Sequence, residues 1–183
     1  RQKRFIELDG DGKRIYERLR TTALAIVEDS TISFSNKLTE IIKLHQVCNG
    51  FTKNDDGEIM TLHKSKLNAL DEILEETDGK VIIWANYIYN INEIIEFLEK
   101  KYGKETVVSI YGAVDVKTRK EAVRRIQEDP KTRFLVGNPT TGGFGLTLTA
   151  VNTVIYFSNN YNLEVRKQSE DRAHRMGQKG TVV

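Results

Sequence analysis

The feature that most constrains this fold is an alternation, from His63 onward, of short apolar runs with longer amphipathic segments. The runs at 81–85 and 154–157 are apolar at every position, which is typical of strands buried on both faces of a parallel sheet. Several of the intervening segments have the length and the periodicity of helices. This order predicts an α/β fold with a doubly wound, mainly parallel sheet.

The chain before His63 reads differently, as two helices and a turn. Residues 10–28 and 34–49 have helical apolar periodicity, and the turn-forming residues at 54–57 predict a small hairpin. The elements expected after His63 are helix 64–77, strand 81–85, helix 90–101, strand 106–110, helix 115–128, strand 133–137, strand 153–157 and helix 162–174. We therefore expect a helical lead-in at 1–62 and an α/β domain at 63–183, truncated at a last strand that begins at 181–183.

Composition limits the class of protein. The 183 residues are 39% hydrophobic and 30% charged, and no apolar run approaches the roughly 18 residues that a membrane helix needs. Cys48 is the single cysteine and no signal peptide is evident, so we expect an intracellular protein without a disulfide. The compartment would be the cytoplasm or nucleoid in a bacterium or phage and the nucleus in a eukaryote. Because the chain begins with Arg1, we expect it to be a piece of a longer protein.

Basic residues concentrate in one segment of the α/β region. Residues 117–133 contain seven basic and three acidic side chains. Such a segment can form a nucleic-acid footprint, and an exposed helix face is the commoner explanation of a charge cluster.

The loop at 138–145 is the most unusual of the loops that follow predicted strands. In an open parallel sheet, ligands gather at the carboxyl ends of the strands. This loop combines three glycines, which allow backbone N–H groups to approach a ligand, with two threonines that can bond a phosphate. It is neither a nucleotide P-loop, because no Gly-Lys-Ser or Gly-Lys-Thr follows, nor a dinucleotide fingerprint, because Leu148 replaces the third glycine. A plain tight loop remains the alternative.

A predicted helix near the end of the chain carries a second candidate anion site. Gln168, Arg172 and Arg175 fall at i, i+4 and i+7, so an amide and two guanidinium groups project from one face. Permanently charged planar donors suit a polyphosphate. The alternative is a salt-bridged helix in which Glu170 and Asp171 neutralise the arginines.

No metal site is predicted. His45 and Cys48 lie three residues apart on a helix, with His63 further on, but a fourth zinc ligand is missing. The acidic residues at 9–11 resemble the start of a calcium loop, but Arg14 stands where that loop needs glycine.

The order of these features resembles the second RecA-like lobe of superfamily-two helicases, in the form found in Swi/Snf-type DNA translocases. Asp171–Gln178 reads Asp-Arg-Ala-His-Arg-Met-Gly-Gln and resembles motif VI, and Thr141–Leu148 resembles motif V. Three further segments also match. Lys80–Tyr87 resembles motif IV, and Tyr111-Gly112 with Arg119 resembles the family's glycine-turn segment. Leu44–Gly50 resembles its helical Leu-Arg-x-x-Cys-Asn element. The resemblance implies a three-layer RecA-like domain, preceded by part of the helical insertion that separates the two lobes.

The same resemblance implies a role in ATP hydrolysis for the complete protein. The first lobe of that protein would be the partner of this one and would hold most of the ATP and Mg²⁺. Arg172 and Arg175 would act as arginine fingers, Gln168 would help to position them, and Gly145 would contact the nucleotide. The fragment alone would be inactive.

The resemblance also implies contacts with the backbone of double-stranded DNA. The residues that would make them are Asn86, Gly112, Thr140, Thr141, Gly142 and Gly143. This sequence departs from the family at Pro139, Thr140 and Thr147, where a hydroxyl residue, a basic residue and asparagine are usual. Pro139 cannot donate an N–H, so we expect a neighbouring threonine to replace that contact.

Two other functions remain open from the sequence. One is a nucleic-acid-binding or regulatory RecA-like module without motor activity, which a missing upstream P-loop and acidic box would favour. The other is a nucleotide-sugar transferase, which explains the α/β order but not the paired arginines. Binding of a sugar nucleotide by this chain alone would support it.

Overall fold

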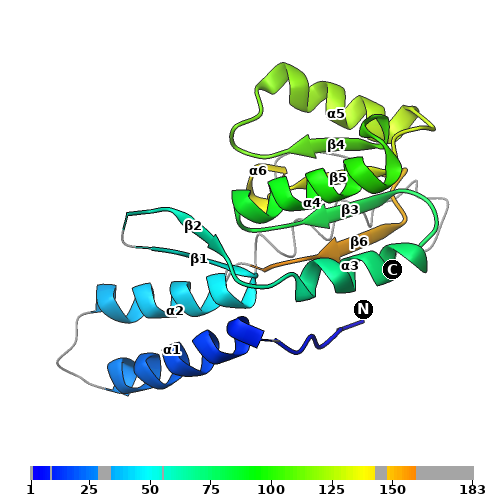
Figure 1. Ribbon diagram of the computed structural model, residues 1–183. Helices are drawn as coiled ribbons and strands as arrows, with labels where there is room; N and C mark the ends of the chain where they lie inside the picture. The colour runs from blue at the N-terminus through cyan, green and yellow to red at the C-terminus, as the bar shows by residue number, and fades with distance from the viewer. Residues whose placement is uncertain (1, 9, 29–33, 55, 143–147, 160–183) are drawn as a thin grey trace. The chain divides into compact units, whose positions relative to one another are not determined.

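The computed structural model describes residues 2–8, 10–28, 34–54, 56–142 and 148–159 of the chain (Figure 1). The chain divides into two compact units, one of residues 3–72 and one of residues 73–183 together with residues 1 and 2. The division falls within helix α3 (Ser65–Glu75). The domain boundary expected at residue 62 stays a prediction.

The unit of residues 3–72 contains two helices and a hairpin. Helices α1 (Gly10–Glu28) and α2 (Phe34–Cys48) pack against each other, and strands β1 (Phe51–Lys53) and β2 (Ile59–Thr61) pair antiparallel. The bounds of α1 agree with the sequence prediction, and α2 ends one residue before its predicted end. Next to the turn expected at 54–57, the Asn54 N–H donates to the carbonyl of Glu58 at 3.0 Å.

A buried histidine fixes the end of α2 in this unit. His63 Nε2 lies 2.8 Å from the carbonyl oxygen of Val47, so this nitrogen donates to a helix-end carbonyl. Gly12 lies against the ring, because a Cβ there would come within 2.3 Å of His63 Cδ2. The histidine considered in the sequence as a metal ligand therefore packs against α1 and caps α2.

The α/β unit is built on a four-stranded parallel sheet in the order β4-β5-β3-β6 (Figure 1). Its strands are β3 (Val81–Trp84), β4 (Val107–Ile110), β5 (Phe134–Gly137) and β6 (Thr153–Tyr156). Its other elements are α4 (Ile88–Tyr102), η1 (Lys104–Thr106), α5 (Val116–Glu128) and α6 (Pro139–Gly142). The predicted parallel α/β architecture is confirmed.

The alternation of side chains along the strands places α4 and α5 on opposite faces of the sheet. Ile82 and Leu135 form a buried cluster with Ile126 of α5. Phe134 precedes Leu135 and points to the other face, where its ring lies 4.9 Å from the ring of Tyr102 in α4. The sheet is thus the middle of three layers.

Strand positions agree with the sequence to within one residue at each end, whereas two short helices were not predicted. The loop at 138–145 begins with α6, because Pro139 has its φ preset at the first helical position and Asn138 caps the turn. Helix α4 begins at Ile88, two residues before its predicted start. The helix expected at 162–174 lies outside the described residues. Within the described part of the chain, no helix combines the length and the apolar character that crossing a membrane requires.

Candidate functional site

The loops that follow the four parallel strands are joined by hydrogen bonds at the carboxyl edge of the sheet. The N–H of Asn138, after β5, donates to the carbonyl of Ile110 at the end of β4 at 3.1 Å. The Asn138 side-chain amide donates to the carbonyl of Asn86, after β3, at 3.0 Å. The N–H of Asn86 in turn donates to Ser158 Oγ, after β6, at 2.8 Å. The edge at which the sequence predicts ligand binding is therefore one connected surface.

Gly137 allows these strand ends to lie so close together. A Cβ at this position would come within 2.3 Å of the carbonyl oxygen of Ile110 and 3.2 Å of Trp84 Cζ3. Because the carbonyl belongs to the backbone of β4, which is paired with β5 along its length, it cannot move aside at low cost. A glycine is thus required where β5 passes into the loop at 138–145.

Helix α6 holds the two threonines of this loop. Asn138 Oδ1 accepts the N–H of Thr140 at 2.9 Å, and its carbonyl accepts the N–H of Thr141 at 3.1 Å. These two backbone donors are therefore bonded within the loop. The Thr140 and Thr141 hydroxyls make no hydrogen bond to any other described residue, and Thr140 is exposed.

Gly112 lies in the loop between β4 and α5, and Arg119 braces that loop. Arg119 Nε donates to the carbonyl of Val114 at 2.7 Å, and Nη2 donates to the carbonyl of Gly112 at 3.1 Å. Gly112 is exposed, and a Cβ there would meet nothing within 4 Å. The loop thus leaves room for a ligand to approach the Gly112 backbone.

Asp115 caps α5 at the end of the same loop. Its Oδ1 accepts the N–H groups of Lys117 and Thr118 at 2.9 and 3.0 Å, and its Oδ2 accepts the Thr118 hydroxyl at 2.5 Å. The Thr118 hydroxyl, with the Thr118 N–H after it, holds the pKa of Asp115 below its usual value. The carboxylate that fixes this helix is therefore charged at neutral pH.

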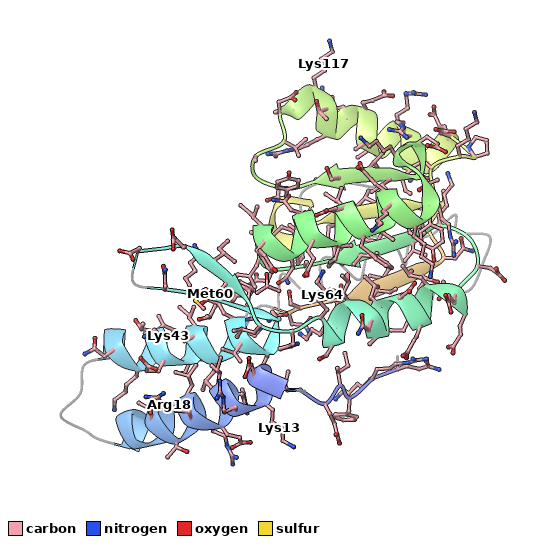
Figure 2. The ribbon with its side chains drawn as sticks, viewed as in Figure 1. Lys13, Arg18, Lys43, Met60, Lys64 and Lys117 are labelled. Atoms are coloured by element: carbon pink, nitrogen blue, oxygen red, sulfur yellow. The ribbon has the colours of Figure 1, made fainter. Side chains whose placement is uncertain are left out.

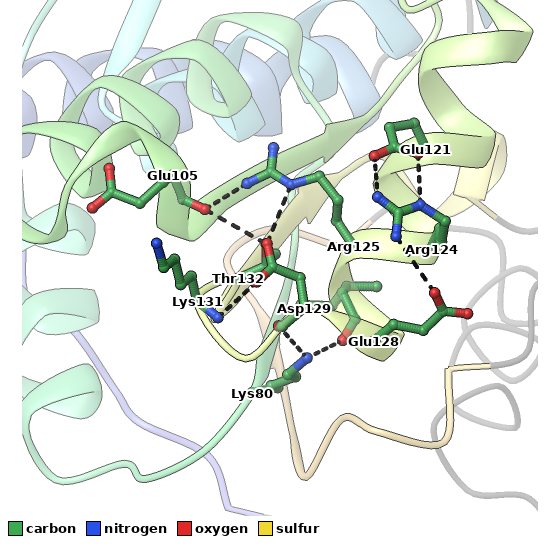
Figure 3. Close-up of polar contacts among 10 residues, drawn as sticks. Lys80, Glu105, Glu121, Arg124, Arg125, Glu128, Asp129, Lys131 and Thr132 are labelled. Carbon is green, nitrogen blue, oxygen red and sulfur yellow. Dashed lines mark hydrogen bonds and ion pairs between the residues drawn. The ribbon is translucent and has the colours of Figure 1, made fainter.

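Most of the basic segment at 117–133 is engaged in local structure. Arg124 pairs with Glu121 at 2.7 Å and Glu128 at 3.5 Å (Figure 3). Arg133 donates to carbonyls at the end of α3 and lies over the ring of Tyr102, with Cζ 5.3 Å from its centroid. Lys117 is exposed and points away from α5 in Figure 2. Of the seven basic side chains in this segment, Lys117, Lys120 and Lys131 are exposed and make no ion pair with a described residue.

A second polar network lies where α5 ends and is structural (Figure 3). Lys80 donates to the carbonyls of Ile126 and Asp129 at 2.6 and 2.9 Å, which caps the end of α5. Burial lowers the pKa of Lys80. Arg125 donates to the carbonyl of Glu105. Because these cations already bind backbone oxygens, we do not assign this network to a ligand.

The structure describes only some of the residues predicted to form the site. Asn86, Gly112, Thr140 and Thr141 lie in the loops at the carboxyl edge, and Gly142 is the last residue of α6. Five predicted site residues lie outside the described residues, namely Gly143, Gly145, Gln168, Arg172 and Arg175.

The sequence prediction missed the roles of Asn138 and Ser158, which join the loops. An Asn-Pro pair after a strand is a turn signal, so the position of Asn138 was marked in the sequence although its partner was not. Ser158 carries no signal beyond being the first polar residue after an apolar run.

Comparison with known proteins identifies the family. The model of the helicase conserved C-terminal domain matches residues 65–177, which is more than half of the chain. The chain belongs to this family. The matched residues begin with α3 and include every strand of the parallel sheet.

A curated relative of this helicase C-terminal domain is an uncharacterised ATP-dependent helicase of Mycoplasma genitalium. It is 29% identical over 181 residues, which cover 97% of this chain and 17% of the relative. The chain thus spans about a sixth of the length of that relative.

Two solved structures share the fold of this helicase C-terminal domain. The C-terminal part of the Fun30 ATPase domain has a TM-score of 0.75 at 19% identity, covering 98% of this chain and 81% of the other. The SWI2/SNF2 ATPase core of Sulfolobus solfataricus, solved in complex with double-stranded DNA, has a TM-score of 0.72 at 23% identity. That match covers 97% of this chain and 39% of the other. These likenesses confirm the predicted RecA-like fold, and the family match confirms the predicted helicase C-terminal lobe.

Proposed function

We propose that this chain is the second lobe of an ATP-dependent translocase that moves on double-stranded DNA. The lobe binds the DNA backbone at the carboxyl edge of its sheet and supplies two arginine fingers to an ATP site shared with the first lobe. The family match and the names of helicase relatives support ATP use. The related Sulfolobus core in complex with double-stranded DNA supports the choice of duplex.

The observation that carries the DNA contact is the hydrogen bonding that joins the loops of the carboxyl edge. Asn86, Gly112 and Thr140 come from three loops that follow different strands. Asn138 donates to the carbonyls of Asn86 and of Ile110, the last residue of β4, and accepts the N–H of Thr140. A phosphate backbone bound across these loops would contact parts that hold one another in place. Such contacts position a duplex without reading its sequence.

The threonine hydroxyls are the groups of α6 best placed to donate to a phosphate. The Thr140 and Thr141 N–H groups are already bonded to Asn138, and Pro139 has no N–H to offer. This supports the substitution inferred from the sequence, in which a threonine replaces the contact that Pro139 cannot make. Gly142 and Gly143 complete the proposed DNA-contacting loop.

The proposed contact with ATP rests on the hydrogen-bond donors that four residues of this lobe provide. Arg172 and Arg175 provide guanidinium groups, Gln168 provides an amide and Gly145 provides a backbone without a side chain. These groups fit a polyphosphate, and Mg²⁺ is assigned mainly to the first lobe. In phosphoryl transfer, charge develops on the equatorial oxygens, and planar permanent cations stabilise it.

The proposal is tested with the full-length protein by measuring ATP hydrolysis with and without a blunt-ended duplex, and displacement of a third strand from a triplex. We expect the duplex to stimulate hydrolysis and the triplex to be disrupted only with ATP. Duplex binding without stimulated hydrolysis would contradict the motor function and favour a binding module. Absence of duplex binding would contradict the DNA contact itself.

A further inference from the structure

The loop at 111–115 and the first turns of α5 contain an arginine whose contacts face inward. Arg119 is half-buried, and it reaches back past the start of its own helix to the carbonyls of Gly112 and Val114. Two separate nitrogens make these bonds, so the guanidinium fixes the direction of two peptide groups. A lysine, with one ammonium group on a flexible stem, does not reproduce this geometry.

The direction of the Gly112 carbonyl determines the direction of the next N–H group. In a trans peptide the carbonyl and the following N–H point in opposite directions. Because the Gly112 carbonyl points at Arg119, the Ala113 N–H points away from it. Ala113 is exposed, and its N–H makes no hydrogen bond to another described residue.

The charge of Arg119 also differs from that of its neighbours on α5. Arg124 is paired with two glutamates, whereas no carboxylate among the described residues pairs with Arg119. Its positive charge therefore remains behind the outward N–H of Ala113. Peptide donors in front of an unneutralised cation favour an anion such as a phosphate.

We propose that Arg119 is a positioning residue that turns the Gly112–Ala113 peptide outward, so that the Ala113 N–H donates to a phosphate of the DNA backbone. This inference rests on the proposed function, in which Gly112 contacts DNA. Arg119 itself does not touch the DNA. The free space above Gly112 allows the phosphate to approach the peptide.

The test uses the full-length protein and the variants Arg119→Lys and Arg119→Gln, with Arg124→Ala as the control that removes a charge from the same helix. The readouts are the duplex concentration that gives half-maximal ATP hydrolysis, the rate at saturating duplex, and hydrogen exchange at 111–115 with and without duplex.

We expect both Arg119 variants to raise the half-saturating concentration about three- to tenfold, as for the loss of one hydrogen bond. The rate at saturation should stay within about twofold of the wild type, because no group that reacts has been removed. Arg124→Ala should leave both values unchanged.

Hydrogen exchange tests the wild-type protein directly, so the inference does not depend on how the variants fold. Duplex should slow exchange at the Ala113 amide. If duplex binds but leaves exchange at 111–115 unchanged, or if Arg119→Lys matches the wild type, the positioning role is overturned while the proposed function stands. Equal weakening by Arg119→Gln and Arg124→Ala overturns it as well, because the effect is then one of general charge. If wild-type protein does not bind duplex, the proposed function fails and the inference fails with it.

Discussion

The side-chain amide of Asn138 donates a 3.0 Å hydrogen bond to the main-chain carbonyl of Asn86. This bond joins the loop after β5 to the loop after β3, two neighbouring strands of the sheet. Asn138 Oδ1 meanwhile accepts the N–H of Thr140. One side chain therefore sets both the separation of the two loops and the conformation of α6, on which the proposed DNA contact depends.

Replacing Asn138 should separate its two roles. Asn138→Ala removes both bonds, and we expect the half-saturating duplex concentration to rise about tenfold, from ~1.4 kcal/mol of lost hydrogen bonding. Asn138→Asp keeps the acceptor for Thr140 but loses the donor to Asn86 and adds a negative charge. The aspartate variant should therefore be the more stable of the two in thermal unfolding and the weaker in duplex binding.

The control for these variants is Asn92→Ala, which truncates an exposed asparagine on α4. It should leave unfolding and duplex binding unchanged. If Asn138→Asp binds duplex as tightly as Asn138→Ala, no phosphate approaches this loop and the DNA contact at α6 is wrong.

Gly112→Ala should weaken DNA binding without affecting the fold. A Cβ at Gly112 would meet no atom within 4 Å, so thermal unfolding of the variant should match that of the wild type. A bound phosphate would be crowded by the same methyl group, and we expect about tenfold weaker duplex binding from ~1.4 kcal/mol of overpacking. Fluorescence anisotropy with a labelled duplex measures this change. Wild-type affinity in this variant would place the DNA elsewhere.

Gly137→Ala, unlike Gly112→Ala, should destabilise the fold. Its Cβ would collide with the carbonyl of Ile110, and the strand ends would have to move apart. We expect a loss of about 1–3 kcal/mol in the free energy of unfolding, as for other overpacked cores. Denaturant unfolding of this chain beside Gly112→Ala measures the difference, and equal stability of the two variants would contradict the close approach of β4 and β5.

The sequence predicts the strands of the sheet well because they are buried on both faces. Val81–Trp84 and Phe134–Gly137 are fully buried runs, and their apolar residues leave few alternatives to a parallel sheet. The hydrogen bonds between loops are not predictable in the same way. The contact of Asn138 with Asn86 joins residues 52 positions apart, so no local pattern records it. Helix α6 is missed because four residues are too few for a periodicity.

The lowered pKa of Asp115 predicts that the stability of the fold depends on pH in the acid range. Its pKa is lowered in the folded state, chiefly by the Thr118 hydroxyl, so the folded chain favours the carboxylate. The stabilisation is complete above the usual aspartate pKa of about 3.9 and is lost as the pH falls through the lowered folded value. Asp115→Asn should unfold at a lower temperature than wild type at pH 7, and the difference should shrink below pH ~4.

The measurement for Asp115 is the thermal unfolding midpoint of this chain from neutral to acid pH. Glu96→Gln, which neutralises an exposed carboxylate on α4, serves as the control and should follow the wild type. A difference between Asp115→Asn and wild type that stays constant with pH would show that the charge of Asp115 does not cap α5.

Arg172→Ala and Arg175→Ala test the proposed arginine fingers in the full-length protein. Each variant should lower duplex-stimulated ATP hydrolysis by about 10³-fold or more, because an arginine finger stabilises charge that develops in the transition state. Binding of ATP should change much less, since most of the nucleotide is assigned to the first lobe. Single-turnover hydrolysis and equilibrium binding of a fluorescent ATP analogue separate these effects.

Arg124→Ala is the matched control, because it removes an arginine that is held by Glu121 and Glu128 on α5. Wild-type turnover in both finger variants would exclude these arginines from the ATP site, and equal losses of binding and turnover would assign them to ground-state binding.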